Sequence, residues 1–169
     1  MHHVAIPVTI VPKPQEEKLP TTRPSDIHRV LLAVDGSKHA ARAVEYVCNL
    51  RGPRDLLQVE LLNVPQASPI PPGYVWSFDQ QEKLDSWHRK ASEGVLQAAT
   101  DALHAAGVHL NAHILAGPPA GNIVELAQKH DCTRIVMGTR GLGPIIGPVL
   151  GSVAYTVLHL SPIPVTLVK

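Results

Sequence analysis

The 169-residue chain is poor in cysteine, in aromatic residues and in net charge. Its two cysteines, Cys48 and Cys132, supply neither a disulfide framework nor a CxxC pair, and this scarcity favours a reducing compartment. Fifteen basic residues against fourteen acidic ones leave a net charge of +1. Binding a nucleic-acid backbone usually requires a clustered basic excess. We therefore expect no nucleic-acid partner, and we expect both thiols to be buried among apolar groups.

Long apolar runs are missing as well. The most apolar stretch, residues 145–150, is interrupted by Gly147 and Pro148 and is far shorter than the roughly 20 residues that span a bilayer. The first residues of the chain lack the basic start and the uninterrupted apolar run of a secretory signal. The sequence therefore predicts a cytoplasmic protein that does not contact membranes.

Proline is abundant instead, with 16 residues in all, five of which precede Asp26. Because proline fixes φ and lacks an N–H group, no regular period can be sustained there. We interpret residues 1–27 as an extended, proline-rich arm and residues 28–169 as one domain. The apolar segment 4–11 has two interpretations, a loosely ordered tail or a strand added to a sheet edge or to a partner. The composition favours the tail.

Apolar runs and helical periods alternate regularly after the arm. Strands are predicted at residues 30–34, 56–64, 109–115, 134–137 and 163–168. Helices are predicted from the Ser37 cap to about residue 50, at 80–106, from the Pro118-Pro119 pair and at 152–160. Strands that alternate with helices favour a mostly parallel sheet, because parallel neighbours need right-handed crossover connections. We therefore expect an α/β domain with helices on both faces of the sheet.

A glycine-rich segment, residues 138–152, joins the fourth predicted strand to the last predicted helix. Gly138, Gly141 and Gly151 lack the side chains that would keep a ligand away from main-chain N–H groups. Gly151 and Ser152 lie where the next helix presents unpaired N–H donors, and both hydrogen bonding and the helix dipole favour an anion there. Ser152 adds a hydroxyl donor, and Arg140 could lie over a phosphate as a fixed positive charge.

The segment does not satisfy either of the common phosphate-binding motifs. Residues 138–143 have the glycine spacing of a P-loop, but Pro144 stands where the lysine is required. The dinucleotide fingerprint that would begin at Gly141 fails because Ile146 replaces its third glycine. A phosphate site here would depend on main-chain N–H groups.

Ten histidines raise the possibility of a metal site. The best pair on one strand, His109 and His113, would be roughly 13 Å apart, whereas one zinc ion holds its ligands about 2 Å away. No G-x-S-x-G sequence marks a hydrolase nucleophile. We therefore predict no metal site and no catalytic residue.

The pattern G-x2-G-x9-G-S, formed by Gly138, Gly141, Gly151 and Ser152, accompanies an Asp35-Gly36-Ser37 turn after the first strand. Together they resemble the ATP-binding members of the universal stress protein family, over about residues 28–169. The resemblance implies an open five-stranded parallel sheet of order 3-2-1-4-5 with a Rossmann-like arrangement. It places a nucleotide at the carboxyl ends of strands one and four, where the switch-point rule also locates ligands.

Individual roles follow from the same resemblance. It implies that four residues surround adenine and ribose: Asp35, Val64, Met137 and Gly138. It implies that four others hold the phosphates: Gly141, Gly151, Ser152 and Val153. Many relatives carry basic residues where this chain has Pro144 and Pro148, so phosphate affinity is less securely implied than adenine affinity.

Asp35 and the glycine segment also have purely structural interpretations. A carboxylate at a strand end, such as Asp35, accepts from ribose hydroxyls or helps to hold a divalent cation. It also commonly bonds its own backbone two residues on, as a turn residue. The glycine segment, likewise, is explained either by a ligand or by a packed turn.

The combined interpretation is a cytoplasmic ATP-binding stress-response protein that acts as a nucleotide-dependent binding or regulatory module, with or without Mg²⁺ or Mn²⁺. One alternative is a slow ATPase or nucleotidyl-transfer enzyme that uses a divalent cation. Another is a dimeric scaffold that binds no nucleotide. The resemblance also implies a homodimer through strand five, and the sequence itself indicates only that an exposed strand edge needs a cover.

Overall fold

The computed structural model describes residues 7–12, 28–50, 56–65, 78–142 and 150–169, without the side chains of 78–88. These residues form six strands and four helices. Their order is β1 (Val8–Ile10), β2 (His28–Ala33), α1 (Lys38–Cys48), β3 (Leu57–Asn63), α2 (Phe78–Ala105), β4 (His109–Ile114), α3 (Pro119–Lys129), β5 (Arg134–Gly138), α4 (Ser152–Leu160) and β6 (Val165–Val168). From β2 onward, this order confirms the predicted alternation of strands and helices.

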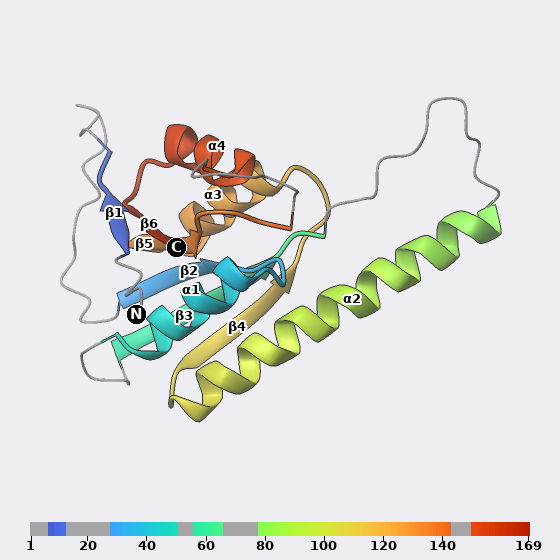
Figure 1. Ribbon diagram of the computed structural model, residues 1–169, viewed down its shortest axis with the longest axis horizontal. Coiled ribbons are helices and arrows are strands. Elements are labelled where there is room, and N and C mark those ends of the chain that lie inside the picture. Colours follow the sequence, from blue (N-terminus) through green and yellow to red (C-terminus); the bar gives the residue numbers. More distant parts are fainter. Residues whose placement is uncertain (1–6, 13–27, 51–55, 66–77, 143–149) are drawn as a thin grey trace, which may run out of the picture.

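The strands form one sheet of order β1-β6-β5-β2-β3-β4 (Figure 1). β2 lies in the centre and pairs in parallel with both β3 and β5, while β4 and β6 pair in parallel on the outside. Without β1, this is the predicted order 3-2-1-4-5. The central parallel strands are mostly apolar because helices cover both faces, and Leu31, Leu61 and Ile135 from three adjacent strands are 0% exposed.

Two apolar layers lie on opposite faces of the sheet. One is formed with α1 and α2 and includes Val47 and Leu103. The other is formed with α3 and α4 and includes Ile123 and Val157. Figure 1 shows α2 running beside α1 and extending past the sheet at its amino-terminal end. In the described part of the chain, no helix is long and apolar enough to cross a membrane.

The amino-terminal strand β1 corrects the expectation of a loosely ordered arm. Residues 8–10 pair antiparallel with β6, with Thr9 opposite Thr166, and the hydroxyl oxygens of these two threonines are 2.8 Å apart. The alternative interpretation, a strand added to a sheet edge, is the one observed. β6 would otherwise present unpaired N–H and C=O groups along an edge, and β1 pairs with them. The rest of the predicted arm, residues 1–6 and 13–27, lies outside the described residues.

The threonine pair offers a test of this strand. Thr166 is 0% exposed, so Thr9→Val leaves its hydroxyl buried without that partner, and we expect a loss of about 1–2 kcal/mol in the free energy of unfolding. Replacing both threonines by valine recovers most of the loss, because two apolar groups of the same shape leave no polar atom unpaired. Urea unfolding measures both variants. Equal stability of wild type and Thr9→Val would contradict the docking of β1.

Candidate functional site

The carboxyl ends of β2 and β5 lie side by side, with Ala33 opposite Met137. After β2 the chain enters α1 on one face of the sheet, and after β5 it leads to α4 on the other face. Open α/β sheets bind ligands where consecutive connections diverge in this way. The glycine-rich segment begins at this point, so its geometry decides what the site can hold.

Asp35 follows β2 and contacts both sides of this switch point. Its Oδ1 accepts a hydrogen bond from the N–H group of Ser37 at 2.9 Å, which is the turn role considered as an alternative. Its other oxygen faces the glycine segment, because a Cβ added at Gly141 would lie 2.5 Å from Oδ2. The carboxylate therefore holds the turn before α1 with one oxygen and lies against Gly141 with the other.

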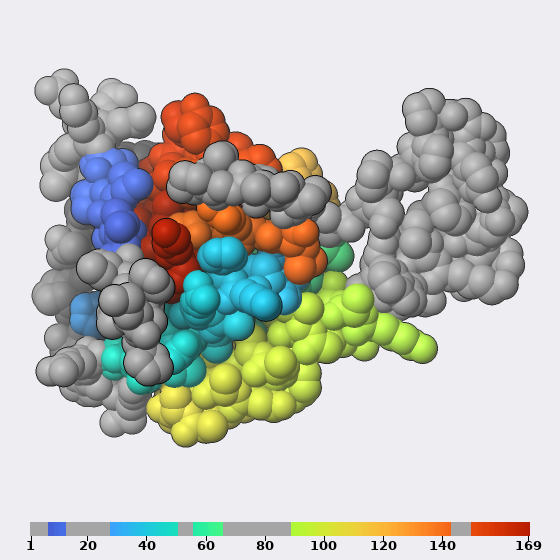
Figure 2. All heavy atoms as spheres, viewed as in Figure 1, coloured from blue at the N-terminus to red at the C-terminus, as the bar shows by residue number. Residues whose placement is uncertain are grey.

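Ser37 joins the start of α1 to the same segment. Its hydroxyl accepts from the N–H group of Ala40 at 3.1 Å, which confirms the predicted helix cap. The hydroxyl also donates to the carbonyl of Arg140 at 3.3 Å. Figure 2 shows the atoms around residue 140, in orange, directly against the light-blue start of α1. One short polar side chain thus ties α1 to the segment that follows β5.

Gly138 owes its lack of a side chain to packing. A Cβ at this position would lie 2.7 Å from the Cβ of His39 and 2.8 Å from the carbonyl carbon of His39. Contacts this close do not occur, so only glycine lets the first turn of α1 approach β5. From the sequence, we interpreted the missing side chain of Gly138 as making room for a ligand. In the structure, the first turn of α1 packs where that side chain would lie.

Gly151 closes the other end of the segment. Its N–H group donates to the carbonyl of Thr139 at 2.9 Å, and an added Cβ would lie 3.2 Å from the Cα of Arg140. Gly151 is the N-cap of α4 and has no side chain with which to cap it, while Ser152 in the first turn is exposed. The first amides of α4 therefore lie beside residues 139–141. Residues 143–149, which include the prolines of the spacer, lie outside the described residues.

The remaining residues that the sequence predicted to bind the nucleotide, Val64, Met137 and Val153, are apolar. Val64 and Met137 are 9% and 6% exposed and belong to the apolar layer on the α3 and α4 face. Val153 is half-buried against the same layer. The structure thus brings Asp35 together with the glycine segment and the start of α4, with apolar side chains beneath them.

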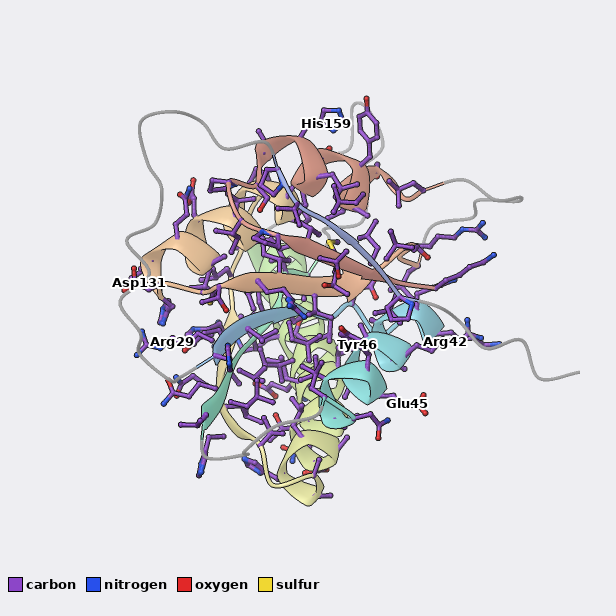
Figure 3. The ribbon with its side chains drawn as sticks, turned by 90° about the vertical axis from the view of Figure 1, so that its left-hand side faces the viewer. Arg29, Arg42, Glu45, Tyr46, Asp131 and His159 are labelled. Carbon is purple, nitrogen blue, oxygen red and sulfur yellow. The ribbon has the colours of Figure 1, made fainter. Side chains whose placement is uncertain are left out.

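The electrostatics of the site centre on His39, which the sequence did not single out. Burial lowers the pKa of His39 below its ordinary value, and the positive charges of Arg42 and Arg140 lower it further, against the opposing charge of Asp35. Arg42 projects from α1 in Figure 3. His39 is therefore neutral at neutral pH, and the positive charge is carried by arginine. Its position two residues after the Ser37 cap was the available sequence signal.

Asn63, at the end of β3, was also missed. Its side chain is buried, and Nδ2 donates to the carbonyl of Val34 at 2.8 Å. Its Oδ1 is the one buried side-chain atom that lacks a hydrogen-bond partner in the part of the chain the structure describes. Buried acceptors without partners are rare, and each needs an explanation such as a water or a ligand. A polar residue at the end of a mostly apolar strand was the only sequence signal.

A cavity of about 530 Å³ lies between α1 and α2, on the face of the sheet opposite α4, and reaches the Ser37 turn. Small and apolar residues line most of it, among them Ala40, Val44, Val95 and Ala99. Among the described residues, Ser37 is the only one with a polar side chain that lines it, and that hydroxyl already donates to the carbonyl of Arg140. The cavity therefore suits an apolar group better than an anion.

Comparison with known proteins decides the family. The sequence pattern of the universal stress protein family matches residues 26–169. The chain belongs to this family. A universal stress protein from Thermus aquaticus, encoded in the 3′ region of a QAH/OAS sulfhydrylase, is 33% identical over 141 residues, which cover 83% of this chain and 97% of the relative. A universal stress protein from Methanocaldococcus jannaschii is 28% identical, over 83% of this chain and 81% of its own.

Solved structures agree with the fold. A universal stress protein family protein from Arabidopsis thaliana with AMP bound has a TM-score of 0.61 at 21% identity, over 84% of this chain and 91% of its own. A universal stress protein in complex with cAMP has a TM-score of 0.57 at 24% identity, over 84% of this chain and 96% of its own. At such identities the likeness establishes the α/β fold of the family.

Two glycines provide a matched test of the packing at the switch point. Gly138→Ala forces α1 away from β5, and we expect a loss of about 1–3 kcal/mol in the free energy of unfolding. At Gly121 in α3, an added Cβ meets nothing within 4 Å, so Gly121→Ala should stabilise the protein by about 0.5–1 kcal/mol. Chemical unfolding of both variants compares the two effects. A neutral Gly138→Ala would show that α1 does not pack this closely.

Proposed function

We propose that this protein is a cytoplasmic ATP-binding module in which nucleotide occupancy, and not turnover, is the signal. The observation that carries the proposal is the meeting of residues 139–141 with the uncapped start of α4, beside Asp35. Relatives that hold AMP and cAMP support a nucleotide as the class of ligand. The absence of a disulfide between Cys48 and Cys132 supports the compartment.

The phosphates would be held at the start of α4. Main-chain N–H groups of the first helical turn point outward there, and the helix dipole adds favourable potential for an anion. Ser152 supplies an exposed hydroxyl, and Arg140 supplies charge. This arrangement relies on the backbone instead of a P-loop lysine, so it suits binding better than phosphoryl transfer.

The nucleoside would lie toward β2 and β3. Asp35 follows β2, and its Oδ2, which lies against Gly141, can accept from ribose hydroxyls, since Oδ1 is already engaged by Ser37. Val64 and Met137 offer apolar surface beneath a base. The Oδ1 atom of Asn63, which lacks a partner in the described part of the chain, is an acceptor for an amino group or a water near this position.

Nucleotide binding would affect the sheet edge at β6 through two hydrogen bonds. The segment is tied to α1 by the bond between Ser37 and Arg140, and to β6 by the bond from the N–H group of Thr139 to the carbonyl of Val168, at 2.9 Å. A phosphate that orders this segment would therefore stabilise the end of β6. The edge of β6 carries β1, so ligand binding and the state of that edge are linked.

Ser152→Asp separates binding from folding. An acidic residue at the first position of α4 stabilises the helix by about 0.3–1 kcal/mol through its dipole. A bound phosphate would meet a like charge, which costs about 1–4 kcal/mol at close range and weakens ATP binding about tenfold or more. Isothermal titration calorimetry measures affinity, and thermal unfolding measures stability.

Two controls accompany this variant. Ser152→Ala removes one hydroxyl donor and should weaken binding only several-fold, by about 0.5–1.5 kcal/mol. Ala105→Asp places the same charge on the exposed end of α2, near the amino ends of the strands, and should leave affinity unchanged. If Ser152→Asp binds ATP as tightly as wild type, the phosphates do not lie at α4.

We infer that a homodimer through β6 forms only when β1 leaves the edge, because β1 and a second copy would pair with the same main-chain groups. Removing residues 1–12 exposes that edge. We expect the shortened chain to dimerise at concentrations where the full chain is monomeric, as measured by sedimentation equilibrium. Equal masses for the two chains at every concentration would exclude this competition.

A further inference from the structure

A second polar cluster lies in the sheet, away from the glycine segment. Glu60 in the middle of β3 is 3% exposed and faces the same apolar layer as Leu62. His113 reaches it from the neighbouring strand β4, and His130 reaches it from the end of α3. A charged residue buried in an apolar layer is rare unless it is paired or binds a metal.

The ligand atoms of the three side chains converge. Glu60 Oε2 lies 2.6 Å from His113 Nε2, and Glu60 Oε1 lies 3.5 Å from His130 Nδ1. The two imidazole rings have centroids 5.1 Å apart and meet edge to face. One ligand atom from each residue lies within 4.8 Å of the other two. Ligands around a tetrahedral ion with bonds of about 2.1 Å lie roughly 3.4 Å apart, so the 2.6 Å contact between Glu60 and His113 would have to open to admit an ion.

The backbone holds His130 in place. His130 ends α3, and Asp131 follows in the left-handed conformation with φ of 50°. The N–H groups of Asp131 and Cys132 donate to the carbonyls of Gln128 and Ala127 at 3.1 and 2.8 Å, which is a Schellman motif. The helix therefore terminates at one defined residue. Its negative dipole end lies beside the cluster, which favours a cation.

A second set of contacts orients the other members. Asn111 Nδ2 donates to Glu60 Oε1 at 3.0 Å, and Arg29 Nη1 donates to the carbonyl of His130 at 3.4 Å. Outer partners of this kind fix the ligands of metal sites and tune their affinity. Arg29 lies at the start of β2, so the cluster lies toward the amino ends of the strands. The proposed nucleotide site is at their carboxyl ends.

The neighbours of the buried Glu60 carboxylate compensate for its burial. Burial pushes the pKa of Glu60 upward, but hydrogen bonds from His113 and Asn111, with the charge of His130, outweigh it and hold the pKa below its usual value. The neighbouring thiol of Cys132 differs. Burial, and secondly the charge of Glu60, raise the pKa of the Cys132 thiol to about 12, and its sulfur is not among the converging ligand atoms.

We propose that Glu60, His113 and His130 form a binding site for a divalent transition-metal ion of the Zn²⁺ type. Two imidazoles and one carboxylate suit zinc and leave a fourth coordination position. The side chains of His113 and His130 are 22% and 28% exposed, so water reaches that position. On binding, the metal replaces the proton between Glu60 and His113, which moves to Nδ1 of His113 or to solvent, and a proton on Nδ1 of His130 moves to Nε2 of that ring or to solvent.

Cobalt is the probe for this site, because Co²⁺ substitutes for Zn²⁺ and absorbs strongly in the visible when four- or five-coordinate. The untagged, nucleotide-free full chain is titrated in a background that carries His2→Gln and His3→Gln, which removes two further imidazoles. We expect one equivalent of Co²⁺ to bind with that absorption and to be displaced by Zn²⁺. Without nucleotide, the outcome does not depend on the proposed ATP site.

Three variants and one control test whether Glu60, His113 and His130 are the metal ligands. His113→Gln and His130→Gln should each weaken metal binding by about 100-fold or more, and Glu60→Gln should do the same if it folds. His109→Gln, an exposed position on the same strand as His113, should leave binding unchanged. Circular dichroism checks each fold. A six-coordinate spectrum, or undiminished binding by the folded His113→Gln and His130→Gln variants, would show that the cluster is only a hydrogen-bonded network.

Discussion

The close approach of α1 to the end of β5 is the constraint on which the rest of the site depends. Gly138 has no side chain, so the first turn of α1 lies directly on β5, and Ser37 reaches the carbonyl of Arg140 from there. Asp35 then meets Gly141, and Gly151 closes the segment against Thr139. Packing and main-chain hydrogen bonds thus position the start of α4. No catalytic side chain is needed to explain this arrangement.

Much of the fold was predictable, because the apolar runs of the parallel strands and the caps of their helices are local signals. The pairing of β1 with β6 was not predictable in the same way. It joins threonines 157 residues apart, and a strand of three residues has too short a sequence pattern to identify its partner. From the sequence, we expected the exposed edge of the last strand, β6, to pair with another strand. Only the structure assigns that strand to the same chain, as Figure 1 shows.

The sequence predicted which glycines lie at the candidate site, but it did not predict the contacts that require glycine at these positions. Spacing identified Gly138, Gly141 and Gly151, while the structure explains the first two by contacts with His39 and Asp35 and the third by its fit against residues 139–141. The cluster around Glu60 escaped the sequence because its members come from two strands and a helix end. The prediction of no metal site rested on the strand spacing of His109 and His113, and it did not combine His130 with Glu60. The register places Asn111 opposite Glu60, with His109 and His113 two residues to either side, and it is the His113 ring that hydrogen-bonds to Glu60.

Main-chain amides at the start of α4 are the groups that we propose bind the phosphates of a nucleotide. Amide ¹H–¹⁵N spectra recorded during titration with ATP observe these groups themselves. We expect the largest shifts at Gly141, Gly151, Ser152 and Val153. Shifts confined to the cavity between α1 and α2, around Ala91 and Ala98, or no shifts at saturating ATP, would contradict this proposal.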